Sequence, residues 1–193
     1  DSMPYHVLAL LQQEIQAGRA PVTINALEQA ILVKLRTTPL KKLSKIYEIT
    51  EGLEYRIQEA AITSGTLEEL RQSIKSKRYS LTKINRLLLY ALLNIETQQM
   101  LNLDRNGPLY IHILGFSTKG RKILQEIKNK SSLRILNRGS EVKDACQDRS
   151  NPDLQAMLSL DVQANNVYTL LYPHSSNRHG ARDFTTSPMI IDN

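Results

Sequence analysis

The chain has 193 residues, a formal net charge of +6 and 41% hydrophobic residues. That apolar fraction is too high for a disordered chain, and no run approaches the ~20 consecutive apolar residues of a membrane span. The single cysteine, Cys146, cannot form an internal disulfide, which fits the reducing cytoplasm. The first residues carry no signal-peptide pattern. We therefore expect a cytoplasmic protein without a membrane segment.

Helical patterns with their capping residues fill the first half of the chain. Four polar residues stand where helix N-caps belong: Asn25, Thr50, Thr66 and Ser80. Thr66 and Glu69 have the spacing of a capping box. The sequence predicts helices between Pro4 and Gly18, after Asn25, after Pro39, from Glu51 to about Ile62, after Thr66, and from Ser80 to about Ile95.

The pattern changes after Asn106-Gly107-Pro108. The sequence predicts a strand over 109–114, a break at Gly115, a helix from Ser117 to about Lys130 and a strand over 133–136, which is about the shortest crossover unit. A last helix is predicted from Asn151-Pro152 to about Leu171. We expect an α+β fold that is mainly α-helical, with a small strand–helix–strand unit in the second half. Its two regions, 1–104 and 105–193, are expected to pack as one compact unit.

The positive charge is concentrated in the middle of the chain. Residues 71–138 carry 14 basic and 3 acidic side chains, whereas acidic residues outnumber basic ones on either side. A first cluster contains no acid and consists of Arg71, Lys75, Lys77, Arg78, Lys83 and Arg86. Within it, Lys83 and Arg86 lie off the apolar face of their predicted helix. Such a concentration favours a nucleic-acid partner over a merely solvated surface.

A second basic cluster begins in the predicted helix after Ser117. The cluster continues beyond that helix and comprises Lys119, Arg121, Lys122, Lys128, Lys130, Arg134 and Arg138, of which the first five are the candidate phosphate-binding residues. The preceding turn imitates a phosphate-binding P-loop, but Arg121 replaces the required lysine and Lys122 replaces the serine or threonine that binds magnesium. We therefore expect no nucleotide site there. The turn and its helix are expected to meet RNA phosphates instead.

Other combinations of reactive residues are not assembled by the sequence. The four histidines lie far apart or in the tail, and Cys146 has acidic neighbours that would not lower its pKa. We expect no catalytic, cofactor-binding or metal-binding residues. Arg56 stands among glutamates that would repel phosphate, so we predict that its role is structural.

Several short segments resemble one known family, in the same order along the chain. They are Glu51–Arg56, Lys75–Arg86, Leu114–Phe116 with Gly120-Arg121, and Asp183-Phe184 with Ser187-Pro188. The family they resemble is the bacterial tRNA(Met) cytidine acetate ligase family. The resemblance extends from near the first predicted helix to the tail.

That resemblance implies a function. In the family, a front nucleotidyltransferase-like domain uses ATP and magnesium to activate acetate as acetyl-adenylate, and the acetyl group passes to N4 of the wobble cytidine of elongator tRNA(Met). This chain resembles the back half, which helps to hold the tRNA, and the front domain is absent from it. We therefore expect an inactive fragment that needs the upstream domain. Lys77, Arg78, Lys83 and Arg86 match the family's basic motif, although Lys83 stands where arginine is common, which loses bidentate phosphate geometry.

Two alternatives remain open from the residues alone. The basic surface could serve a protein-interaction module that meets an acidic partner, which binding to tRNA but not to acidic proteins would exclude. A self-sufficient nucleotide-using enzyme rests only on the defective P-loop pattern.

Overall fold

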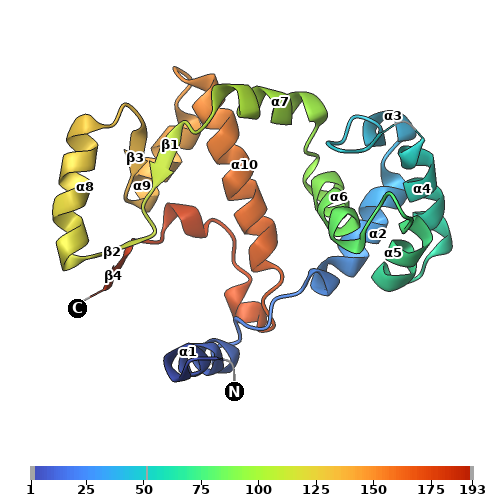
Figure 1. Cartoon of the computed structure of the whole chain (residues 1–193), viewed down its shortest axis with the longest axis horizontal. Helices are drawn as coiled ribbons and strands as arrows, with labels where there is room; N and C mark the ends of the chain where they lie inside the picture. Colours follow the sequence, from blue (N-terminus) through green and yellow to red (C-terminus); the bar gives the residue numbers. More distant parts are fainter. Residues whose placement is uncertain (1–2, 51, 192–193) are drawn as a thin grey trace. The chain divides into compact units, whose positions relative to one another are not determined.

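The computed structural model describes residues 3–50 and 52–191, and its internal contacts divide the chain into two compact units (Figure 1). The first contains the residues up to Asn102 together with Leu170–Arg178, and the second contains Leu103–Thr169 with the residues from His179 onward. The predicted α+β class with mainly helical content is confirmed. The packing of the whole chain as one compact unit stays a prediction.

The first unit is helical. Its elements are α1 (Tyr5–Gln16), the 3-10 helix η1 (Ile24–Leu27), α2 (Glu28–Thr37), α3 (Leu40–Leu43), α4 (Leu53–Thr63), α5 (Leu67–Ile74), α6 (Leu81–Leu93), the start of α7 (Thr97–Asn106) and the 3-10 helix η2 (Ser175–Asn177). Its core is aliphatic, with Ile31, Leu35, Ile57, Leu70 and Ile84 at most 2% exposed. Buried residues recur at helical spacing within each of α2, α4, α5 and α6, so each of these helices turns an apolar face inward.

Two of the predicted caps are confirmed and two are wrong. The Thr66 hydroxyl accepts the Glu69 N–H at 3.2 Å while the Glu69 carboxylate accepts the Thr66 N–H, and the Ser80 hydroxyl caps α6. Asn25 lies inside η1 instead of capping a helix. Thr50 is replaced as the cap of α4 by Gly52, whose φ of 85° is a left-handed conformation that glycine adopts freely. Glu51, the predicted first residue of that helix, lies outside the described residues.

Helix α1 forms as predicted, after Pro4 and before Gly18. Over its described length Tyr5–Gln16, however, it contains no buried side chain. The C-terminal end of α1 contacts the segment Leu170–Arg178 of the same unit, because the His174 N–H donates to the Gly18 carbonyl at 3.2 Å. The periodicity thus predicted the helix correctly but not its exposure.

The second unit combines helices with two short parallel strand pairs. Its elements are the rest of α7, β1 (Tyr110–His112), β2 (Gly115–Ser117), α8 (Thr118–Lys130), β3 (Arg134–Leu136), α9 (Gly139–Gln147), α10 (Pro152–Thr169), the 3-10 helix η3 (Arg182–Phe184) and β4 (Met189–Ile191). Strand β1 pairs with β3 in parallel across the α8 crossover, which confirms the predicted strand–helix–strand unit. Strand β2 pairs in parallel with β4.

Three features of this unit differ from expectation. Gly115 begins strand β2 instead of only ending a strand. Helices α7 and α9 have no counterpart among the predicted elements, because α7 is polar and largely exposed and α9 starts at Gly139 without a side-chain cap.

The core of the unit consists of Leu136, Val142, Ala145, Leu154, Leu158 and Val162. Within the described residues, no helix is both long and apolar enough to cross a membrane.

Candidate nucleic-acid interface

A tight turn joins α5 to α6 and presents basic side chains to solvent. The Tyr79 N–H donates to the Ser76 carbonyl at 3.2 Å, and the Ser76 N–H donates back to the Tyr79 carbonyl at 3.3 Å. The Tyr79 side chain is buried, and its hydroxyl is hydrogen-bonded to the Thr50 hydroxyl at 2.9 Å. With both ends of the turn fixed, its two middle residues, Lys77 and Arg78, are exposed.

The buried tyrosine also organises the charges around the turn. The Lys83 ammonium lies 5.2 Å from the centre of the Tyr79 ring, and the Arg78 guanidinium lies 5.7 Å from it. Both distances are within the range of cation–π attraction. We call Lys75, Lys77, Arg78 and Lys83 the turn cluster. Among the described residues, none of these four side chains forms an ion pair, so their charges are available to an external anion.

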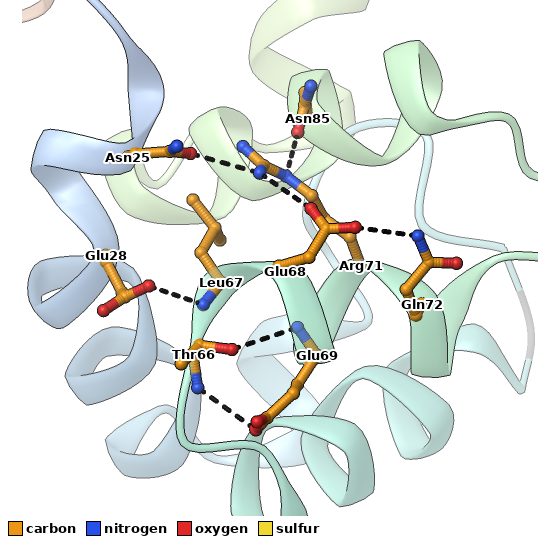
Figure 2. A network of polar contacts seen from close by, with 9 residues as sticks. All are labelled: Asn25, Glu28, Thr66, Leu67, Glu68, Glu69, Arg71, Gln72 and Asn85. Carbon is orange, nitrogen blue, oxygen red and sulfur yellow. Dashed lines mark hydrogen bonds and ion pairs between the residues drawn. The ribbon is translucent and has the colours of Figure 1, made fainter.

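Arg71 does not belong to this exposed set, although the sequence placed it there. It is only 8% exposed. Figure 2 shows its guanidinium between two asparagines: it donates to the Asn85 side-chain oxygen at 2.7 Å and to the Asn25 side-chain oxygen at 3.1 Å. It also contacts Glu68 at 3.5 Å. Arg71 therefore joins η1, α5 and α6, and we remove it from the candidate interface.

Arg86 is also partly engaged inside the protein. Its Nη2 donates to both carboxylate oxygens of Glu48, at 3.0 and 2.9 Å. This hydrogen bonding raises the pKa of Arg86 above its ordinary value. Because its charge is already neutralised locally, Arg86 is a weaker candidate for a phosphate contact than Lys77 or Arg78.

Arg56 has partners that differ from those expected. Its guanidinium donates to the backbone carbonyls of Ser73, at 3.2 and 3.1 Å, and of Lys75, at 3.0 Å. Within the described parts of the chain it has no ion pair with a glutamate. The carbonyls at a helix C-terminus lack intrahelical donors, so Arg56 satisfies the end of α5.

We expect Arg56→Ala to lower the thermal midpoint by about 2–4 °C, because the lost hydrogen bonds are worth about 1 kcal/mol. The affinity for tRNA is expected to change less than about two-fold, since the guanidinium faces the protein's own carbonyls. Circular-dichroism melting and filter binding on the same preparation measure both effects. A large loss of affinity at an unchanged midpoint would show that Arg56 contacts RNA.

The second basic cluster lies on α8, in the second unit. We call Lys119, Arg121, Lys122, Lys128 and Lys130 the α8 cluster; all five are exposed. As in the turn cluster, none of them forms an ion pair with another described residue. The Arg121 guanidinium lies 5.7 Å from the centre of the Phe116 ring, on the adjacent strand β2. Helix α8 thus presents unneutralised positive charge along its length.

The segment that imitates a P-loop does not fit ATP and magnesium. Residues Gly115–Ser117 form a paired strand, and the Ser117 hydroxyl accepts the Gly120 N–H at 3.1 Å as the cap of α8. The described residues contain no group of three or more histidine, cysteine, aspartate or glutamate side chains that could hold a metal ion. Burial raises the pKa of the Cys146 thiol, which lowers the fraction of reactive thiolate. We derive no chemical step at any of these residues.

The sequence identified the cations of the turn cluster and the α8 cluster but not the framework that presents them. Tyr79 is both the anchor of the turn and the ring beside Arg78 and Lys83. An aromatic residue directly after Arg78 and four residues before Lys83 was the available signal. The role of Arg71 was not readable, because its partner Asn25 lies 46 residues away in the sequence.

Comparisons with known proteins give a consistent relationship. The family model described as HIGH Nucleotidyl Transferase matches residues 1–183. The tRNA(Met) cytidine acetate ligase of Syntrophomonas wolfei is 55% identical over 93% of this chain and 43% of its own length. The protein of the same name from Halothermothrix orenii is 39% identical over 91% of this chain and 42% of its own length. The chain therefore spans somewhat less than half of these relatives.

Solved structures show the same relationship as the sequence comparisons. The apo crystal structure of Thermotoga maritima TmcAL superposes with a TM-score of 0.91 at 30% identity, over 100% of this chain and 47% of that one. The structure of the same protein bound with alpha-thio ATP gives a TM-score of 0.90 at 31% identity, over 99% of this chain and 47% of that one.

Proposed function

We propose, because the chain belongs to the HIGH nucleotidyl transferase family and is homologous to a portion of tRNA(Met) cytidine acetate ligase, that it is the tRNA-holding part of such a ligase. Its work is to position tRNA(Met) so that the wobble cytidine reaches a catalytic centre on the remaining part of the enzyme. Phosphate contacts fix orientation without reading bases, and correct placement lowers the entropic barrier to the reaction.

The observation that carries this proposal is the turn cluster. The turn fixed by Ser76 and Tyr79 presents Lys77 and Arg78 to solvent. No described acidic residue forms an ion pair with any cation of the turn cluster. Cations crowded in this way repel one another, and a phosphate backbone relieves that repulsion by replacing condensed counterions. The α8 cluster supplies a second set of exposed cations for the same polyanion.

Binding of a tRNA(Met) transcript over a series of salt concentrations tests the proposal. We expect the logarithm of the association constant to fall linearly with the logarithm of salt, by roughly 0.7–0.9 for each phosphate neutralised. An acidic protein serves as the competitor in the same binding assay. If that protein binds as tightly as the tRNA, the basic surface belongs to a protein-interaction module and the proposal is wrong.

The same proposal predicts that the chain alone does not activate acetate. The P-loop-like segment is a paired strand followed by a helix cap, and the described residues contain no cluster of acidic, histidine or cysteine side chains for a metal ion, so we expect no release of pyrophosphate from ATP in the presence of acetate and magnesium. Calorimetry with ATP and magnesium is expected to show no binding tighter than about 0.1 mM, a free energy near −5.5 kcal/mol. Turnover by the purified chain would show that it carries a complete catalytic site.

A further inference from the structure

A cavity of about 750 Å³ lies in the second unit, between α8, the start of α9 and the segment around Phe184. Its volume is within the range of known small-ligand sites, roughly 300–1,000 Å³. The wall at α9 depends on Gly139, because a Cβ there would lie 2.2 Å from the Phe184 backbone carbonyl. Glycine therefore allows the chain near Phe184 to pass close beside the start of α9, and both segments line the cavity.

Most of the lining is uncharged, and among its charged side chains the cations outnumber the acids. Arg121, Lys128 and Arg138 line the cavity, against one acid, Glu141. The Glu141 carboxylate already accepts the Asn137 N–H at 2.6 Å, so part of its capacity is used inside the protein. This balance favours an anionic ligand.

The backbone at one end of the cavity also favours an anionic ligand. Helix α9 has no side-chain cap, and within the described residues the N–H groups of Gly139 and Ser140 have no acceptor. Such N–H groups, with the positive end of the helix dipole, attract phosphate. The first turn of α9 also carries the Glu141 carboxylate, so the three cationic side chains and the free N–H groups together, and not the helix terminus alone, favour an anion in the cavity.

Two aromatic rings complete the lining. Phe116 and Phe184 both contribute to the wall, and the Arg121 guanidinium lies 5.7 Å from the centre of the Phe116 ring. Unpaired RNA bases stack on aromatic rings and on guanidinium planes. A simple anion would need no rings, and an apolar ligand would need no cations.

We propose that this cavity binds one nucleoside phosphate, with its phosphate at the N-terminus of α9 and its base against Phe116. The nucleotide can be an unpaired residue of the bound tRNA or a free nucleotide. The first source rests on the proposed function, whereas the second does not. The cavity holds a nucleotide by shape, stacking and charge without a reaction.

Nuclear magnetic resonance of the isotope-labelled 193-residue chain tests the cavity directly. Adenosine 5′-monophosphate, adenosine and inorganic phosphate are titrated separately while the amide signals of Gly139 and Ser140 are followed. We expect saturable shifts with adenosine 5′-monophosphate in the millimolar range, and binding at least about ten-fold weaker with either half-molecule, because each lacks the stacking or the charge.

Two charge-matched variants separate the cavity from general electrostatics. Arg121→Gln with Lys128→Gln removes two cations from the cavity, while Lys143→Gln with Arg149→Gln removes two exposed cations of the same unit that do not line it. We expect the first pair of substitutions to lower the affinity for adenosine 5′-monophosphate by about ten-fold and the second pair to lower it by less than about two-fold. Phe116→Leu should lower the affinity for the nucleotide but not the affinity for inorganic phosphate.

The tRNA transcript is then added to the same samples. If it shifts Gly139 and Ser140 and competes with adenosine 5′-monophosphate, the nucleotide comes from RNA. If tRNA does not bind but the free nucleotide does, the proposed function fails and the cavity remains a nucleotide site. If tRNA binds without shifting these amides and adenosine 5′-monophosphate has no effect, the cavity inference is overturned and the proposed function stands. Equal effects of the two charge-matched variants, or equal binding of phosphate and nucleotide, also overturn it.

Discussion

Changing Lys77 and Arg78 together to glutamate is expected to weaken tRNA binding by about ten-fold or more at 0.1 M salt. Both side chains lie at the exposed middle of the Ser76–Tyr79 turn, where they have no described acidic partner. Losing two phosphate contacts should also reduce the salt slope by about 1.4–1.8, because fewer counterions are released. Filter binding over a salt series measures both quantities.

A matched control is available in the same unit. Lys41 and Lys42 are also adjacent and exposed, on α3, and their replacement by glutamate changes the net charge equally. We expect this control to leave the salt slope unchanged and to lower affinity by less than about three-fold, through long-range repulsion alone. If both double variants lose affinity equally, tRNA responds to total charge and the turn cluster has no special role.

The choice of Lys77 and Arg78 illustrates what the sequence could not provide. Helical periodicity alone favoured Lys83 and Arg86 as the pair to change, since both lie off the apolar face of α6. The structure shows Arg86 bound by Glu48, so a glutamate there would face another carboxylate and disturb the fold. Glu48 is 38 residues away in the sequence and reaches Arg86 only through tertiary packing.

Local signals were read correctly where the chemistry is local. The capping box of Thr66 and Glu69 and the cap at Ser80 depend on residues three positions apart, so the sequence contained all of the relevant atoms. The α8 crossover was also readable, because Ser117 starts a helix between two short β-rich runs. Helix α9 was not, because it lacks a capping side chain and its apolar residues pack on α10.

Patterns in sequence also leave open what a predicted surface contacts. In α1, Val7, Leu8, Leu11 and Ile15 repeat as in a buried helix, yet each is at least 39% exposed. Periodicity reports the shape of a helix and not the identity of what covers it. The cavity in the second unit escaped prediction for a related reason: Phe116, Arg138 and Phe184 come from separate segments.

Arg71→Ala is expected to cause the largest loss of stability, about 2–4 kcal/mol, or a decrease of roughly 5–10 °C in the thermal midpoint. The change removes a buried guanidinium and leaves the side-chain oxygens of Asn25 and Asn85 without their donor (Figure 2). These two residues belong to η1 and α6, so the contacts between three elements weaken together. Thermal melting followed by circular dichroism measures the effect.

Arg78→Ala completes a crossed experiment with Arg71→Ala. Arg78 is exposed, so its removal should lower tRNA affinity while the thermal midpoint moves by less than about 2 °C. Arg71→Ala, assayed well below its midpoint, should bind tRNA within about two-fold of the unmodified chain, because the buried guanidinium reaches no phosphate. The stability of Arg71→Lys should fall between those of Arg71→Ala and Arg78→Ala, since an ammonium keeps the charge but cannot span both asparagines as the planar guanidinium does. A selective loss of tRNA affinity in Arg71→Ala, with its stability unchanged, would return Arg71 to the RNA surface.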